Sequence, residues 1–316
     1  MICVKIAGDG RRDILTDISN KTSNYSEAYL VKKKILITGK NGYVAKRFFK
    51  YFTEIGHVVE IISLRNNDWK SIDLSNFDVC IHLAGLVHNN NPNADLEEYM
   101  KINAYLTKDL AVHCKKNNIN HFIYFSTMSV FGNVGVLNHP TIITENSPLQ
   151  PNTYYGISKL KGEELIVELI DDTFKVTVIR PPMIYGKGAP GNFKKLAKFA
   201  NLFPVNPSIY NERSALYIET LEKYMAEIIN HTYTGFFHPQ NSEYLKTKDV
   251  INTIRNAADK KTINLPVSPV INLLISKVTV LNKLYGNLIY DRHIDHNKIT
   301  IENEMPLTET IIKSNS

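Results

Sequence analysis

The residues with the clearest chemical potential are Tyr155 and Lys159, in the stretch Tyr-Tyr-Gly-Ile-Ser-Lys that ends at Lys159. Side chains four positions apart lie on one face of a helix, so the ammonium of Lys159 can sit beside the phenol of Tyr155. A neighbouring positive charge lowers the pKa of a phenol, and we expect it to bring this one towards neutrality. Tyr155 would then exchange a proton near neutral pH, whereas Tyr154 stands at the wrong spacing from Lys159.

Hydroxyl groups precede this pair in the chain. The apolar segment 121–125 predicts a strand, and Ser126, Thr127 and Ser129 come directly after it. Open α/β sheets bind ligands at the carboxyl ends of their strands, so these hydroxyls stand where a substrate can bind. We expect Ser126 and Ser129 to satisfy mainly backbone groups.

A glycine loop lies between a predicted strand at 32–37 and a predicted helix. Gly39 permits a tight turn, and Gly42 lets a pyrophosphate approach the backbone. Ala45 is small enough for the helix to pack closely against the strand. Because the start of a helix attracts anions, this segment predicts a dinucleotide-binding loop.

The end of the second predicted strand, within 56–65, bears on the choice of cofactor. Proteins that bind NAD commonly carry an acidic side chain there, which binds the ribose hydroxyls. This chain has Ser63 at that place, followed by Arg65. A hydroxyl and a guanidinium favour a ribose 2′-phosphate, so we expect NADP, with NAD as the alternative.

Taken in order, the nucleotide loop, the hydroxyl cluster and the Tyr/Lys pair resemble the extended short-chain dehydrogenase/reductase family, the NAD-dependent epimerases, dehydratases and reductases. The resemblance covers residues 32–240 well. It implies an α/β fold with a doubly wound, mostly parallel Rossmann sheet and a small substrate lobe. It also implies catalysis by Tyr155 and Lys159, with Thr127 orienting the substrate oxygen.

The same resemblance implies two sets of binding residues. The guanidinium of Arg213 would clamp a diphosphate that Asn192 also reaches, and Asn103 would support the active site. Asp68 remains an alternative to Asp73 near the adenine. The expected cofactor contacts are Gly39, Asn41, Gly42, Tyr43, Val44, Ser63, Arg65, Asp73, Leu83, Ala84, Gly85, Asn103, Tyr155, Lys159 and Pro182. The expected substrate contacts are Ser126, Thr127, His88, Asn192 and Arg213.

Four short sequence segments indicate a more specific reaction. The segments 82–90, 125–128, 180–186 and 213–217 are similar to 4-ketoreductases of capsule and O-antigen synthesis. Those enzymes reduce a UDP-4-keto-6-deoxy-N-acetylhexosamine to UDP-N-acetylfucosamine or UDP-N-acetylquinovosamine. Two alternatives stay open: a UDP-hexose or UDP-N-acetylhexosamine 4-epimerase that retains NAD, and a dinucleotide-binding regulator without catalysis. Arg65 counts against the first, and the Tyr/Lys pair counts against the second.

The composition is that of a soluble globular protein, with 316 residues of which 43% are hydrophobic and 22% charged. A net charge of +6 suits anionic nucleotides, but the Lys and Arg residues are scattered, so we expect no nucleic-acid partner. Cys3, Cys80 and Cys114 lack metal-ligand spacing and predict reduced thiols, no metal site and a cytoplasmic location. We expect neither a signal peptide nor a membrane segment, because the apolar stretch 267–281 is short and interrupted. The resemblance implies a homodimer through the helices of Asn103 and Tyr155.

The expected domain organisation has four parts. An extension at 1–31 precedes a Rossmann domain at 32–180, which 212–240 rejoins. The substrate lobe would comprise 181–211 and 241–305, and a polar tail would follow at 306–316. Within the helix that starts near Tyr155, we expect Glu163 and Glu164 to be solvated. His82 is expected to be structural.

Overall fold

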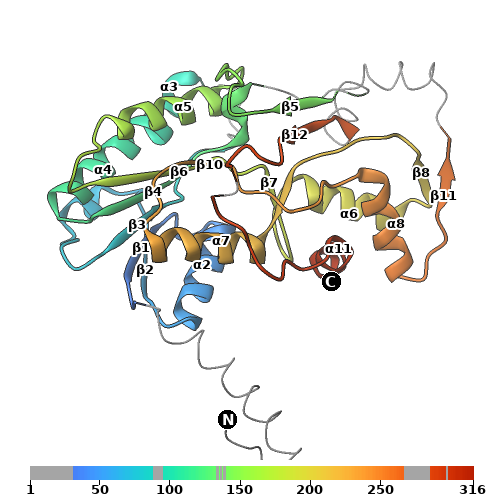
Figure 1. Cartoon of the computed structure of the whole chain (residues 1–316), viewed down its shortest axis with the longest axis horizontal. Helices are drawn as coiled ribbons and strands as arrows, with labels where there is room; N and C mark the ends of the chain where they lie inside the picture. The colour runs from blue at the N-terminus through green and yellow to red at the C-terminus, as the bar shows by residue number, and fades with distance from the viewer. Residues whose placement is uncertain are drawn as a thin grey trace, which may run out of the picture. The chain divides into compact units, whose positions relative to one another are not determined.

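Six parallel strands form a central sheet within residues 33–316 of the computed structural model, in the order β10-β6-β4-β3-β1-β2 (Figure 1). The structure describes residues 31–87, 95–132, 135, 137, 140–266, 285–296 and 298–316. Residues 1–32 make up a separate unit. The strands of the sheet are β1 (Lys34–Thr38), β2 (Val58–Ile62), β3 (Val79–His82), β4 (His121–Phe125), β6 (Lys175–Ile179) and β10 (Gly235–Phe237).

Alternate residues of the central strands enter two hydrophobic cores, one on each face of the sheet. Ile35 and Ile37 of β1 belong to one core, whereas Leu36 between them belongs to the other. Successive side chains of a strand point to opposite faces, so a strand covered on both sides must be apolar throughout. The predicted doubly wound, mostly parallel sheet is confirmed.

Helices cover both faces of this sheet (Figure 1). One face carries α2 (Tyr43–Glu54) and α7 (Ile218–His231), and the other carries α4 (Leu106–Lys116) and α5 (Tyr154–Val167). α3 (Leu96–Met100) runs into α4 through η2 (Lys101–Tyr105), a turn of π-helix. Two short 3-10 helices are η1 (Asn67–Ser71) and η3 (Met128–Phe131).

Three small parallel strand pairs join segments that are distant in the chain. They are β7 (Met183–Tyr185) with β9 (Ala215–Tyr217), β8 (Val205–Pro207) with β11 (Ile263–Leu265), and β5 (Thr141–Ile143) with β12 (Leu288–Tyr290). Three further helices are α6 (Asn192–Leu202), α8 (Thr247–Ala257) and α11 (Leu307–Asn315). The domain boundaries expected from the sequence stay a prediction.

The segment 306–316 is not the polar tail that the sequence suggested, because most of it forms α11. Ile311 is 1% exposed and belongs to the same core as residues of α8. The hydroxyl of Thr310 also lies 2.8 Å from the phenol oxygen of Tyr185. Leu307 packs against the same core, so apolar contacts and a buried hydroxyl together dock this short helix.

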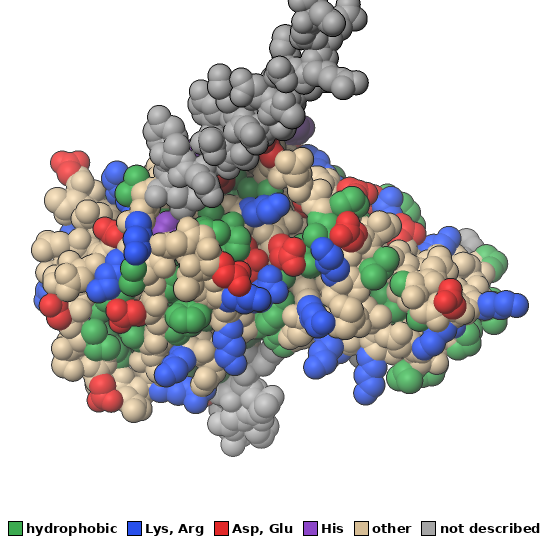
Figure 2. All heavy atoms as spheres, turned by 90° about the horizontal axis from the view of Figure 1, so that it is seen from below, with side chains coloured by type: hydrophobic (Ala, Val, Ile, Leu, Met, Phe, Trp, Pro, Cys, Tyr) green, Lys and Arg blue, Asp and Glu red, His purple; other side chains and the backbone are tan. Residues whose placement is uncertain are grey.

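The described residues also bear on the expectations about cysteines, membrane segments, metal sites and surface charge. Cys80 and Cys114 are buried free thiols. Within the described ranges, no helix has the length and apolar character that a membrane crossing needs. The same residues contain no group of three His, Cys, Asp or Glu side chains that could hold a metal ion. Cys3, His88 and the stretch 267–281 lie outside the described residues. Figure 2 shows Lys and Arg side chains interspersed with acidic and apolar ones over one face.

Candidate active site

The glycine loop connects β1 to α2 at the carboxyl edge of the sheet. Gly39 has a φ of +90°, and its N–H donates to the carbonyl of Ile62, the last residue of β2 (3.2 Å). The N–H of Gly42 donates to the carbonyl of Gly39 (2.8 Å), which closes the turn. Gly42 is the N-cap of α2, and no side chain caps this helix. The amides at the start of α2 are therefore suited to bind an anion.

Two glycines at this edge of the sheet stand where a side chain would meet neighbouring backbone or Lys159. A Cβ on Gly39 would lie 3.1 Å from the amide nitrogen of Ala84, and one on Gly85 would lie 3.2 Å from Nζ of Lys159. Glycine thus keeps two loops and a lysine close together without steric conflict. The remaining predicted contacts of these loops and of the first turn of α2 are Asn41, Tyr43, Val44 and Leu83.

His82, at the end of β3, is fully buried and structural. Its Nδ1 lies 2.7 Å from the hydroxyl of Thr38, and its Nε2 lies 2.9 Å from the hydroxyl of Thr107. The hydroxyl oxygen of Thr38 already accepts from the N–H groups of Leu83 and Ala84 (3.2 Å each), so its own proton is donated to Nδ1. Burial lowers the pKa of His82 to about 3, so the ring is neutral at physiological pH.

Asn103 is buried in the π-helical turn η2. Its side chain accepts from the N–H of Leu86 (2.7 Å) and donates to the Leu86 carbonyl (2.9 Å) and the Ser158 hydroxyl (3.0 Å). The backbone carbonyl of Asn103 accepts from the hydroxyls of Thr107 and Tyr124, both at 2.9 Å. Asn103 therefore ties the loop after β3 to α5. The sequence predicted such a support for Asn103, but it did not indicate Ser158 or Thr107.

Ser63 and Arg65 lie exposed at the end of β2, where the N–H of Arg65 donates to the Ser63 hydroxyl (3.3 Å). This end of the strand adjoins the glycine loop, because Gly39 bonds to the last residue of β2. The carboxylate of Asp73, another predicted cofactor contact, accepts from the N–H of Ser75 (2.9 Å). Hydrogen bonds from Ser75 lower the pKa of Asp73, so this carboxylate stabilises its own turn.

Thr127 and Tyr155 meet at the carboxyl end of β4. The hydroxyl of Thr127 caps η3 by accepting from the N–H of Ser129 (3.1 Å), and it donates to the Ser129 hydroxyl (3.2 Å). Thr153 caps α5 by accepting from the N–H of Gly156 (3.1 Å), which fixes Tyr155 in the first turn. Burial raises the pKa of Tyr155 to about 12, against the opposing effect of Thr127. The expected fall of this pKa towards neutrality is therefore not found.

Lys159 is buried at the end of β4. It is 3% exposed, its ammonium donates to the Phe125 carbonyl (2.7 Å), and it lies 4.5 Å from the ring centre of Tyr124. Burial lowers the pKa of Lys159 to about 7, and Glu163 opposes this fall. A buried ammonium loses favourable hydration, which explains the direction of the shift.

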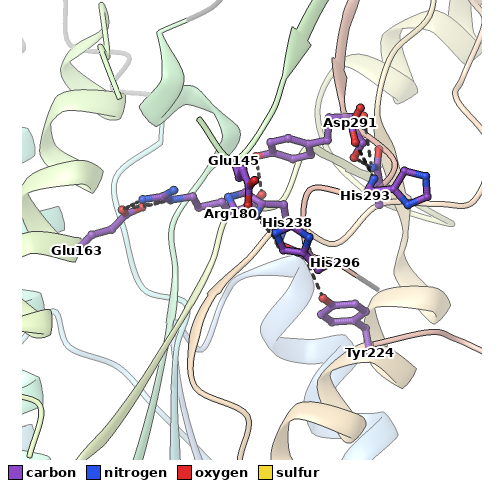
Figure 3. Close-up of polar contacts among 11 residues, drawn as sticks. Glu145, Glu163, Arg180, Tyr224, His238, Asp291, His293 and His296 are labelled. Atoms are coloured by element: carbon purple, nitrogen blue, oxygen red, sulfur yellow. Dashed lines mark hydrogen bonds and ion pairs between the residues drawn. The ribbon is translucent and has the colours of Figure 1, made fainter. Parts of the chain in front are cut away.

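Glu163 is buried, which corrects the expectation of a solvated carboxylate. Its side chain is 2% exposed, and its Oε2 lies 2.6 Å from Nη2 of Arg180 (Figure 3). The hydroxyl of Ser126 also donates to Glu163. The Ser126 hydroxyl therefore binds a carboxylate of α5 and not the backbone groups that were expected for it, and its predicted contact with substrate stays a prediction. The spacing of Tyr155, Lys159 and Glu163, four residues each, could have indicated this common face.

Two predicted diphosphate contacts lie close together. Asn192, the first residue of α6, and Arg213 line one hollow together with Met183 and Thr247. The backbone of Arg213 pairs with Leu245, which fixes the guanidinium stem at this place. A guanidinium and an amide are donors that suit the oxygens of a diphosphate.

This chain resembles known proteins in sequence over most of its length. The family model described as NAD dependent epimerase/dehydratase family matches residues 35–205. The chain is 26% identical over 305 residues to the UDP-glucose 4-epimerase of Vibrio cholerae, and the match covers 87% of this chain and 92% of that protein.

Solved structures share the fold at low sequence identity. The dTDP-4-dehydrorhamnose reductase of Bacillus anthracis, in complex with NADP, superimposes with a TM-score of 0.67 at 19% identity, over 89% of this chain and 98% of that one. The UDP-N-acetylglucosamine 4-epimerase of Bacillus cereus gives 0.69 at 18% identity, over 90% and 98%.

Proposed function

The chain belongs to the NAD-dependent epimerase/dehydratase family of nucleotide-sugar enzymes, and from that premise we propose that it is an NADPH-dependent 4-ketoreductase. Its substrate would be a UDP-4-keto-6-deoxy-N-acetylhexosamine, and its product UDP-N-acetylfucosamine or UDP-N-acetylquinovosamine. The observation that carries the choice of reduction is the end of β2, where Ser63 and Arg65 stand exposed beside the glycine loop. A guanidinium there favours the additional phosphate that distinguishes NADPH from NADH. A reductase oxidises one NADPH in each turnover and must exchange it for another.

The residues of the chain have separate tasks in this reaction. Bound NADPH supplies a hydride to C4 of the keto sugar. Tyr155 donates its phenolic proton to the C4 oxygen, and Thr127 orients that oxygen by a hydrogen bond. The ammonium of Lys159 stabilises the phenolate that remains. Asn192 and Arg213 hold the diphosphate from the hollow that they line.

The test is a coupled assay in which a 4,6-dehydratase makes UDP-4-keto-6-deoxy-N-acetylglucosamine in place. Substrate-dependent loss of NADPH absorbance is the expected result, and the NMR coupling at C4 of the product identifies the sugar. Interconversion of UDP-sugars without added cofactor, by protein that retains NAD after purification, would instead identify an epimerase.

The cofactor preference gives a separate prediction. Replacing Arg65 by Ser should lower kcat/KM for NADPH by about tenfold to a hundredfold, the range of a lost hydrogen bond to a charged group, and leave that for NADH nearly unchanged. Lys50→Ser provides the control, since it removes an exposed cation of α2 that pairs with Glu54. Equal efficiency of the unaltered enzyme with both cofactors, or a preference for NADH, would contradict the assignment.

A second candidate function is a UDP-sugar 4-epimerase. It is favoured by the similarity to the Vibrio cholerae UDP-glucose 4-epimerase, which extends over 87% of this chain. An epimerase would use Tyr155, Lys159 and Thr127 as well, but it would retain NAD. The homodimer that the family resemblance implies stays a prediction.

A further inference from the structure

Three side chains of α5, four residues apart, form a column on one face of the helix. They are Tyr155, Lys159 and Glu163, and the last two are 3% and 2% exposed. The first two are assigned to the reaction proposed above. Glu163 has no part in that reaction, yet a buried carboxylate is costly unless it is paired.

Lys159 and Glu163 each contact one of two consecutive residues at the end of β4. The ammonium of Lys159 donates to the Phe125 carbonyl (2.7 Å), and the Ser126 hydroxyl donates to Glu163. The next residue is Thr127, which lowers the pKa of Tyr155. One stretch of backbone therefore connects the lysine, the carboxylate and the substrate-orienting hydroxyl.

Arg180 fixes the position of Glu163 from the neighbouring strand end. Its Nε lies 3.1 and 3.2 Å from the two carboxylate oxygens, and its Nη2 lies 2.6 Å from one of them (Figure 3). The guanidinium carbon also lies 5.3 Å from the ring centre of Phe131 and 4.4 Å from that of Phe236. A bidentate pair whose guanidinium also contacts two rings fixes Glu163 in one orientation.

Other titratable groups also face Lys159 from the elements around it. Tyr155 lies on the same helix, Tyr124 lies on β4, and His82 lies on β3. The pKa of Tyr155 is about 12, that of Tyr124 is far above its ordinary value, and that of His82 is about 3, all because of burial. At neutral pH these three are uncharged. Among the described groups that face Lys159, Glu163 therefore provides the negative charge.

We propose that Glu163 is a positioning residue that keeps Lys159 protonated and fixed at the end of β4, and that Arg180 holds it there for this purpose. The inference concerns the same site as the proposed function and rests on it for the reaction that Lys159 supports. The charge of Lys159 then depends on the ion pair between Glu163 and Arg180, which does not contact the substrate.

The direction of the effect follows from the charges. Burial lowers the pKa of Lys159 to about 7, although Glu163 acts in the opposite direction. Removing the negative charge while Arg180 stays positive lowers the pKa further. The neutral amine then predominates at neutral pH, and activity is lost as pH rises through the lowered pKa. Below that pKa the lysine is charged again, so the rate should recover in acid.

The test is the Glu163→Gln variant, with the Lys159 pKa measured from the pH titration of its ¹³Cε resonance in protein labelled with ¹³C-lysine. The resonance is assigned from its loss in Lys159→Met. We expect the midpoint in Glu163→Gln to fall by about one to three pH units, the usual effect of a close opposite charge. The matched control is Ser126→Ala, which removes a hydrogen bond to Glu163 and keeps its charge, and should move the midpoint by less than half as much.

A second variant guards against loss of folding. Glu163→Gln with Arg180→Gln removes both buried charges, and the midpoint should fall by less than in Glu163→Gln alone, because Arg180 no longer opposes the ammonium. An unchanged midpoint in both variants would overturn the proposal. In active enzyme, the alkaline limb of the kcat/KM profile should move by the same amount, whereas a merely structural loss would lower the rate equally at all pH values. Because the titration needs no substrate, a failure of the proposed function would leave its result intact.

Discussion

Replacing Tyr155 by Phe is expected to lower turnover by about two to four orders of magnitude, the usual effect of losing a general acid. The ring and its packing in the first turn of α5 remain, but the proton for the substrate oxygen disappears. Binding of a UDP-sugar should be nearly unchanged, because Asn192 and Arg213 provide the diphosphate contacts in our proposal. Steady-state rates together with calorimetric titration of the UDP-sugar measure the two effects separately.

The neighbouring residue offers a matched control. Tyr154 is also in the first turn of α5, but its side chain is 50% exposed and contacts Tyr99 through its ring. Tyr154→Phe should therefore retain nearly the full rate. A nearly normal rate in Tyr155→Phe, or a larger loss in Tyr154→Phe, would exclude the assignment of the general acid.

Replacing Gly132 by Ala is expected to lower the free energy of unfolding by about 4 kcal/mol or more, which is exceptional for a single substitution. Gly132 ends η3 with a φ of +70°, and a Cβ there would overlap the carbonyl oxygen of Gln150. The Gly132 carbonyl also accepts from the side chain of Asn152 (2.7 Å). This contact aligns the turn that carries Thr127 with the loop that leads into α5. Urea denaturation measures the loss.

Gly188 separates steric overlap from backbone strain. Its φ is +77°, but no atom of the described residues lies within 4 Å of the place where a Cβ would stand. Gly188→Ala should therefore cost only the penalty of a left-handed alanine, about 1 to 2 kcal/mol. Similar losses in the two variants would show that the contact with Gln150 contributes nothing.

The sequence by itself determined the fold class and the order of the functional segments. The apolar run of β1, the glycines after it, and the hydroxyls after β4 are local features, because a strand covered on both faces must be apolar and a loop that receives phosphate must lack side chains. The placement of Tyr155 and Lys159 on one face of α5 is also local, since helical spacing alone sets it. The assignment of cofactor and substrate contacts stays a prediction, although the structure brings Asn192 and Arg213 to one hollow.

The tertiary structure alone decided how these groups are charged and what supports them. Glu163 looked solvated in the sequence, but α5 packs it against the end of β4 and beside Arg180. Burial raised the pKa of Tyr155 and lowered that of Lys159, where helical spacing had suggested only that the tyrosine would shift. Burial and ion pairing depend on segments that meet only when the sheet and its helices assemble, and so no local pattern of residues contains them.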